Sequence, residues 1–279
     1  MESASMDTDL EAVLSIAREA AEIVRAVYRT PFAVEMKGPN DPVTRADREA
    51  NTLICARLAE VFPGVPIIAE ETPPESLAEA REMVRHERVF FVDPLDGTRE
   101  FADRNPEFAV MIGLAIAGRA ALGVVVMPES GEALCGRVSS SPVAFVEGPD
   151  GARRPLCVTD QRDPTKATMM VSRSHRPRLV EPVAERLGVR RIVPCGSVGV
   201  KVARVATGEA EIYVHGGSGA KLWDTCAPEA ILVAAGGRFS DLDGDPIDYA
   251  YGGLALENGL VATNAALFDT VIEALTALR

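Results

Sequence analysis

The sequence predicts a layered α/β or α+β protein, in which helices pack on the faces of β-sheets. Short apolar runs typical of buried strands alternate with segments whose apolar residues recur at helical spacing. Two longer apolar runs, 108–117 and 120–127, are separated by Gly118 and Arg119 and indicate an antiparallel hairpin rather than a membrane span. The 279 residues are enough for one large domain or for two subdomains that share an interface.

Each element is predicted from apolar periodicity and from capping or turn residues. Apolar residues between Leu10 and Val27 recur at helical spacing, and Thr8 with Glu11 resembles a capping box before them. Thr44 indicates the N-cap of the next helix, after a proline-rich loop. The predicted helices cover residues 9–29, 45–61, 178–188, 227–235 and 271–278, with another beginning at 197 and a helix-prone segment at 72–87. The predicted strands cover residues 65–69, 89–92, 108–117, 120–127, 168–172, 191–193 and 210–214, with two more near 238 and 260.

Composition and charge limit the classes of function. Hydrophobic residues make up 47% of the chain and charged residues 25%, which is typical of a soluble globular protein. The net charge of −12 disfavours a nucleic-acid polymer or an anionic membrane as a partner. Five widely spaced cysteines without a C-x-x-C pair disfavour a disulfide framework or a zinc site and suit a reducing compartment. With an acidic N-terminus that lacks a signal-like pattern, these features predict a cytoplasmic protein without membrane insertion.

One predicted strand and the turn after it carry the strongest functional signal. Val89 to Val92 are apolar, and we expect the strand to stop at Asp93 because the proline that follows cannot donate to a sheet ladder. Asp96 comes three residues later, and Gly97 and Thr98 allow a sharp turn whose free backbone N–H groups can face an anion. Two acids would repel a phosphate at that turn unless a divalent cation lay between them, so this stretch predicts a metal-and-phosphate site.

Other carboxylates also lie at the ends of predicted elements. Asp47 falls in the first turn of its helix, where an acid stabilises the helix dipole by up to about 1 kcal/mol, so capping alone would explain it. Glu70 and Glu71 follow a short strand, where solvation would explain both, and Asp224 lies near another helix start. The Asp-Gly dipeptide is also an ordinary turn signal. The repetition of acids at element ends nevertheless favours a shared function around metal ions.

Two further stretches are less specific. Residues 172–176 form a polar and basic cluster after a predicted strand, which an ordinary helix start explains as well as a contact with a substrate does. The glycine-rich stretch at 215–219 does not match G-x-x-x-x-G-K-[ST], which excludes a nucleotide phosphate loop of that type. Trp223 is expected to pack at a helix start, while the roles of His215 and Lys221 stay open.

Four motifs in this chain order resemble those of the inositol monophosphatase superfamily, whose members are Mg²⁺-dependent, lithium-inhibited phosphatases. They are Val43-Thr44-x-Ala46-Asp47, Glu70-Glu71, Asp93-Pro-Leu-Asp-Gly-Thr98, and Trp223-Asp224 before Ala-Pro-Glu. Within the superfamily, Leu95, Arg99-Glu100 and Ser172-Arg-Ser-His175 make the chain most similar to the 3′(2′),5′-bisphosphate nucleotidases. Those enzymes remove the 3′-phosphate of adenosine 3′,5′-bisphosphate, a by-product of sulfate assimilation.

The resemblance implies a five-layer αβαβα sandwich, of the kind found in inositol monophosphatase and fructose-1,6-bisphosphatase. A turn at 148–151 predicts its division into an N-terminal subdomain, residues 1–148, and a C-terminal subdomain, residues 149–279. The ligands of two to three Mg²⁺ ions would be Glu70, Asp93, Asp96, Asp224 and the carbonyl of Leu95. The residues that orient and deprotonate the attacking water would be Asp47 and Thr98, supported by Glu71. The substrate contacts would be the amides of Gly97 and Thr98, and the side chains of Ser172, His175, Ser197 and Lys201.

The resemblance therefore implies a Mg²⁺-dependent phosphatase for a small phosphorylated substrate, first of all adenosine 3′,5′-bisphosphate, with its sulfated analogue as a second substrate. Divalent ions about 3.5–4 Å apart can activate a water molecule and neutralise the leaving oxygen, so no Cys or Ser nucleophile is required. Two alternatives stay open: an inositol or sugar phosphatase of the same superfamily, and a catalytically silent metal- or nucleotide-binding protein. The number of metals bound at rest and the formation of a homodimer are not determined.

Overall fold

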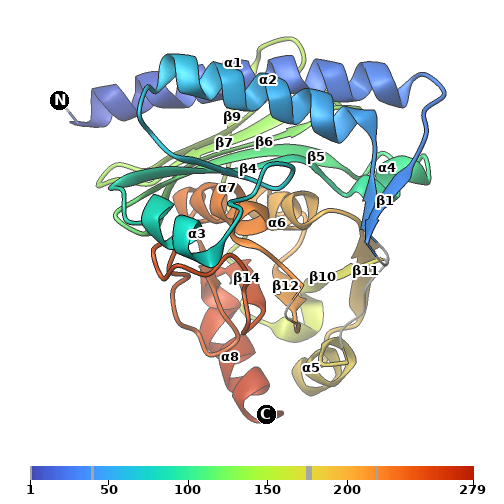
Figure 1. Ribbon diagram of the computed structural model, residues 1–279. Helices are drawn as coiled ribbons and strands as arrows, with labels where there is room; N and C mark the ends of the chain where they lie inside the picture. The colour runs from blue at the N-terminus through green and yellow to red at the C-terminus, as the bar shows by residue number, and fades with distance from the viewer. Residues whose placement is uncertain (1, 39–40, 174–177, 218) are drawn as a thin grey trace.

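Helices and sheets alternate in five layers, and the layered α/β fold predicted from the sequence is confirmed (Figure 1). The structure is a computed structural model that describes residues 2–38, 41–173, 178–217 and 219–279. One pair of helices covers the outer face of a seven-stranded sheet, a second pair lies between the two sheets, and a third pair covers the far face of a five-stranded sheet. The pair on the seven-stranded sheet is α1 (Glu2–Tyr28) and α2 (Arg45–Val61). The pair between the sheets is α6 (Val198–Ala206) and α7 (Leu222–Ala234). The pair on the five-stranded sheet is α5 (Val180–Leu187) and α8 (Phe268–Thr276).

The seven-stranded sheet has the order β3-β4-β5-β6-β7-β8-β9, and its only parallel pair among the described residues is β3 with β4. Its strands are β3 (Ile67–Ala69), β4 (Arg88–Asp96), β5 (Ala109–Ile116), β6 (Arg119–Met127), β7 (Glu132–Arg137), β8 (Val143–Glu147) and β9 (Arg153–Pro155). The predicted hairpin of two long apolar strands is β5 and β6. The predicted subdomain boundary at residue 148 lies in the turn between β8 and β9, which both belong to this sheet.

The five-stranded sheet has the order β11-β10-β12-β14-β13. Its strands are β10 (Thr168–Ser172), β11 (Arg191–Cys195), β12 (Ile212–His215), β13 (Gly237–Ser240) and β14 (Leu260–Asn264). Because β10, β11 and β12 run parallel, their carboxyl ends meet at one edge of the sheet, where ligands tend to bind. The remaining elements are a small hairpin of β1 (Glu35–Gly38) and β2 (Asp41–Val43), the short helices α3 (Leu77–Met83) and α4 (Thr98–Ala102), and 3₁₀ turns at Pro164–Lys166 and Ala265–Leu267.

Several predicted boundaries differ from the structure, such as that of the helix predicted at 227–235, which begins at Leu222. Two of them differ for physical reasons that involve distant residues. Strand β4 does not stop at Asp93 but continues through Pro94 to Asp96, and its register with β5 shifts between the two acids. This β-bulge places the proline where no ladder N–H is needed. Helix α1 begins at Glu2 rather than after Thr8. Its first turns are held against the sheet by ion pairs, such as that of Asp7 with the buried Arg137 at 2.8 Å.

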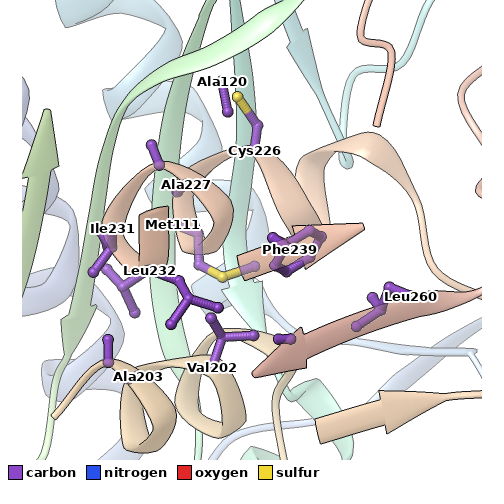
Figure 2. Packing of buried hydrophobic residues seen from close by; sticks show 14 of the residues in the cluster. Met111, Ala120, Val202, Ala203, Cys226, Ala227, Ile231, Leu232, Phe239 and Leu260 are labelled. Atoms are coloured by element: carbon purple, nitrogen blue, oxygen red, sulfur yellow. The ribbon is translucent and has the colours of Figure 1, made fainter. Parts of the chain in front are cut away.

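A row of glycines allows α7 to lie close against the seven-stranded sheet. Gly113, Gly123 and Gly136 are register partners on β5, β6 and β7. A Cβ atom on Gly123 would lie 2.1 Å from the carbonyl oxygen of Ala227 in α7, and the other two would meet the same helix at 2.5 and 2.4 Å. Figure 2 shows Ala227 and Ile231 of α7 among the apolar side chains that fill this contact. The glycine row therefore sets the position of α7, whose first turn carries Asp224.

None of the helices in the described part of the chain combines the length and the apolarity needed to cross a bilayer.

Candidate active site

Four acidic side chains from three elements come together near the carboxyl end of β4. Asp93 and Asp96 lie on the last residues of that strand, Glu70 follows β3 directly, and Asp224 lies in the first turn of α7. Burial raises the pKa of Asp93 well above its usual range, and repulsion from the Glu70, Asp96 and Asp224 carboxylates raises it further. Burial likewise raises the pKa of Asp224, to which Asp96 and Glu70 add. The acids that the sequence predicted to share a site are thus electrostatic neighbours.

Backbone amides orient three of these acids through one oxygen each. The N–H of Leu95 donates to Oδ1 of Asp93 at 2.9 Å. The N–H of Gly199 donates to Oδ2 of Asp96 at 2.8 Å, and the N–H of Lys221 donates to Oδ2 of Asp224 at 2.7 Å. These hydrogen bonds fix the orientation of the three carboxylates before any ligand binds.

The chemistry of this donor set fits a hard divalent cation such as Mg²⁺. Buried carboxylates that repel one another are stabilised when a multivalent cation lies between them, and oxygen ligands favour Mg²⁺, Mn²⁺ or Ca²⁺ over softer metals. The buried Leu95 adds its carbonyl oxygen to the same turn. Among the residues that the structure describes, no three His, Cys, Asp or Glu side chains already surround a single point as metal ligands.

Asp47 and Thr98 form a hydrogen-bonded pair beside the acids. The Thr98 hydroxyl lies 2.9 Å from Oδ1 of Asp47 and 3.0 Å from the carbonyl oxygen of Leu95, so it can donate to either. Oδ2 of Asp47 accepts from the backbone N–H of Thr44 at 2.8 Å and from its hydroxyl at 2.7 Å, which completes the capping box of α2. Burial raises the pKa of Asp47, although the hydrogen bonds from Thr44 oppose the shift.

Lys37, which no sequence pattern predicted as a site residue, approaches the acids from the β1–β2 hairpin. Its ammonium lies 3.0 Å from Oε1 of Glu70 and 2.6 Å from Oε1 of Glu71, with Asp41 farther away at 3.8 Å. Burial lowers the pKa of Lys37, but the two glutamates raise it by more, so the net direction is upward. The hairpin lies within the stretch expected to be an irregular loop, and a lone lysine in such a loop carries no signal for this contact.

A pocket of about 610 Å³ opens beside the acids. Its lining includes Asp96, Thr98, Ser172, Ser197, Lys201 and Asp224. Residues 215–217 and Gly219 contribute another part of its wall, so the end of β12 and the glycines after it border the site. Trp223 is buried in the core, as expected, and Lys221 caps α7 by its backbone. The predicted substrate contact His175 lies outside the described residues.

Two of the predicted substrate contacts also make extensive contacts within the protein. Ser197 is the N-cap of α6, and its hydroxyl donates to Oδ2 of Asp96. Lys201 is only 3% exposed, with its ammonium 3.2 Å from the carbonyl oxygen of Gly196 and 5.2 Å from the ring centre of Tyr213. Burial lowers the pKa of Lys201, and the nearby Asp96 carboxylate opposes that shift.

The chain belongs to the inositol monophosphatase family, whose profile matches residues 5–277. The fold agrees with that of the IMPase of Thermotoga maritima, with a TM-score of 0.80 at 24% identity over 97% of this chain and 98% of the other. Among individual relatives, the 3′(2′),5′-bisphosphate nucleotidase CysQ of Escherichia coli K12 is 36% identical over 248 residues, which are 86% of this chain and 93% of the relative. Human 3′(2′),5′-bisphosphate nucleotidase 1 is 31% identical over 84% of this chain and 83% of its own length. The crystal structure of CysQ from Bacteroides thetaiotaomicron gives a TM-score of 0.76 at 26% identity, over 92% of this chain and 97% of the other.

Proposed function

We propose that this protein is a divalent-cation-dependent phosphatase that converts adenosine 3′,5′-bisphosphate into AMP and phosphate. The observation that carries the proposal is the 36% identity to a nucleotidase named for this substrate class, extending over 86% of the chain. The cluster of buried acids beside a pocket supports it, because a phosphate ester needs charge neutralisation and an aligned water for fast hydrolysis.

We assign a role in cation binding to each acid near the end of β4. The cation ligands are Glu70, Asp93, Asp96, Asp224 and the carbonyl of Leu95. Bound there, two to three Mg²⁺ ions would lower the pKa of a water molecule and neutralise the leaving oxygen. Glu71 pairs with Lys37 at 2.6 Å and would help to position Glu70, which contacts the same ammonium.

The Asp47–Thr98 pair would orient the attacking water and receive its proton. A water that donates to the Thr98 hydroxyl leaves that hydroxyl free to donate to Oδ1 of Asp47, 2.9 Å away. Asp47 is 1% exposed, and its raised pKa makes it a better proton acceptor than an ordinary aspartate. Its Oδ2 is fixed by Thr44, so the carboxylate is oriented before the substrate binds.

The phosphate would be bound by single amides rather than by a helix dipole. Gly97 has a φ of 94°, which a residue with a side chain rarely adopts, and this conformation turns the chain into α4. Helix α4 has only five residues, so its dipole is small. The amides of Gly97 and Thr98 are the donors in this proposal, with Ser172 and Lys201 toward the nucleoside. His175 belongs to the same set as a prediction from sequence.

A comparison of substrates tests the proposal. The purified protein is assayed for phosphate release from adenosine 3′,5′-bisphosphate, its sulfated analogue, inositol 1-phosphate and fructose 1,6-bisphosphate, with and without Mg²⁺ and Li⁺. We expect the highest kcat/KM on adenosine 3′,5′-bisphosphate, dependence on Mg²⁺ and inhibition by Li⁺. Faster release from inositol 1-phosphate would overturn the substrate assignment, and no release from any of the four would favour a silent binding protein.

The location and the assembly remain part of the proposal. All five cysteines are free, which suits a reducing compartment such as the cytoplasm. Cell fractionation tests the location, and light scattering of the purified protein distinguishes a monomer from a homodimer.

A further inference from the structure

Asp96 lies on the seven-stranded sheet, but the layer between the sheets holds its carboxylate. The Ser197 hydroxyl and the Gly199 N–H both donate to Oδ2 of Asp96, and these donors are 101 and 103 residues away in the sequence. The same hydroxyl accepts from the N–H of Val200 at 3.0 Å, so it caps α6 and contacts Asp96 at the same time. Two donors on one oxygen fix the rotation of the carboxylate about its side-chain bonds.

Ser197 makes this contact from a strained backbone conformation. Its φ is 51° and its ψ is 135°, whereas an N-cap residue ordinarily has a negative φ in the extended region. A non-glycine residue in such a region is strained and persists only where its surroundings enforce it. A glycine would adopt this conformation at lower cost, but it would not supply the hydroxyl.

Neighbouring contacts enforce the conformation from both sides. The N–H of Gly196 donates to Oε2 of Glu107 at 2.8 Å, and the guanidinium of Arg173 lies 2.6 Å from the same oxygen. The Lys201 ammonium holds the carbonyl of Gly196 at 3.2 Å. A Cβ atom on Gly196 would lie 2.3 Å from the side chain of Glu100, so Glu100 packs directly against the backbone of this loop. These contacts keep the Ser197 hydroxyl directed at Asp96.

We infer that the Ser197 side chain is a positioning residue for the cation site, and that its hydroxyl holds a cation ligand rather than the substrate. Its hydroxyl holds Oδ2 of Asp96, and this leaves Oδ1 as the oxygen that binds the cation. The inference rests on the proposed function, because it takes Asp96 as a cation ligand. It also makes the affinity for the cation depend on how α6 packs against the end of β4.

Direct titration with Mn²⁺, followed by electron paramagnetic resonance without substrate, tests the inference. Ser197→Gly removes the hydroxyl and relieves the strain, while Ser197→Ala removes the hydroxyl and keeps the strain. Loss of an outer-shell hydrogen bond typically weakens metal binding about 10–100-fold. We expect a loss in that range for both variants, although urea unfolding should show the glycine variant to be the more stable of the two. Ser172→Ala, which removes another hydroxyl from the same pocket, should leave Mn²⁺ affinity unchanged.

A second measurement separates positioning from substrate contact. At saturating Mn²⁺, the KM of Ser197→Gly for adenosine 3′,5′-bisphosphate should stay within about twofold of the parent value, because the lost affinity is for the cation. A KM that stays high at every Mn²⁺ concentration would overturn the inference, as would wild-type Mn²⁺ affinity in Ser197→Gly. If the parent protein binds Mn²⁺ but releases no phosphate, the proposed function fails while the positioning role of Ser197 is still tested by the titration.

Discussion

The ammonium of Lys37 lies 3.0 Å from the carboxylate of Glu70, a residue that we propose as a cation ligand. The hairpin thus supplies a positive charge at the place where a divalent ion would find its oxygen ligands. Lys37 also pairs with Glu71, whose side chain is 7% exposed, so part of this charge network is shielded from water.

Replacement of Lys37 by glutamine should strengthen cation binding. A divalent ion at Glu70 has to displace or share the lysine's ion pair, and an ion pair at this depth is worth about 1 kcal/mol. We expect Lys37→Gln to bind Mn²⁺ about fivefold more tightly than the parent protein does. We also expect the metal-free variant to be less stable than the metal-free parent. Isothermal titration calorimetry measures the first effect and urea unfolding the second. Lys166→Gln, which breaks the exposed pair with Asp163, is the matched control and should change neither. Weaker Mn²⁺ binding by Lys37→Gln would contradict this account.

Asp93→Asn should abolish turnover while the protein stays folded. Asparagine keeps an oxygen that accepts from the Leu95 N–H, but it removes a negative charge that the other buried acids repel. Phosphate release should fall by more than about 100-fold, which exceeds the loss typical of an outer-shell partner. Urea unfolding of the metal-free protein should show a stability equal to or higher than that of the parent. Full activity in this variant would place the site elsewhere.

Thr98→Val should lower kcat with little effect on cation binding. Valine has nearly the shape of threonine but lacks the hydroxyl that reaches Asp47, and the bonds between Thr44 and Asp47 that cap α2 are left intact. Loss of a general acid–base relay costs about 10²–10⁴ in rate. Stopped-time phosphate assays at saturating Mg²⁺ measure the loss, and Thr98→Ser should restore most of the rate. Equal rates in the valine and serine variants would exclude the relay.

The sequence predicted the acids because each has a local signal at the end of an element. For Asp47 and Asp224 the two explanations, helix cap and site residue, turn out not to exclude each other. A carboxylate has two oxygens: Oδ2 of Asp224 accepts from the N–H of Lys221 as a cap, and the residue still borders the pocket. Capping therefore orients these acids, and a sequence pattern that indicates a cap also indicates a fixed carboxylate.

Features that depend on distant contacts could not be predicted in this way. Lys37 reaches Glu70 only because the β1–β2 hairpin forms, and the strain at Ser197 exists only because Glu107 and Asp96 hold its loop. The three aligned glycines look like ordinary strand interruptions in the sequence. Their alignment depends on the register of β5, β6 and β7, which no local pattern specifies.

Gly123→Ala should destabilise the protein and weaken the site together. The new Cβ would lie 2.1 Å from the carbonyl oxygen of Ala227, so α7 would have to move away from the sheet. Overpacking of this kind costs about 1–3 kcal/mol, and the shift would displace Asp224 at the start of α7. Urea unfolding and Mn²⁺ titration measure the two effects. A variant with parent-like stability and unchanged Mn²⁺ affinity would show that α7 does not depend on this contact.

Glu229 should make the stability of the protein depend on pH. It is 8% exposed, and its Oε2 accepts from the hydroxyl of Tyr249 at 2.6 Å. Burial raises its pKa from 4.5 to about 8, so the folded protein keeps the proton over a range in which the unfolded chain has lost it. The stabilisation is therefore fully present below pH 4.5 and is lost as the pH rises toward about 8.

Urea unfolding of the parent protein and of Glu229→Gln at pH 5, 6.5 and 8 measures this contribution. Glutamine keeps an acceptor for Tyr249 but does not titrate, so the difference between the two proteins isolates Glu229 from the other buried acids. The slope for one such group is about 1.4 kcal/mol per pH unit, and the parent should lose stability relative to the variant by a few kcal/mol across this range. Parallel stability curves would mean that Glu229 is ionised in the folded protein, and its charge would then need a buried partner beyond Tyr249.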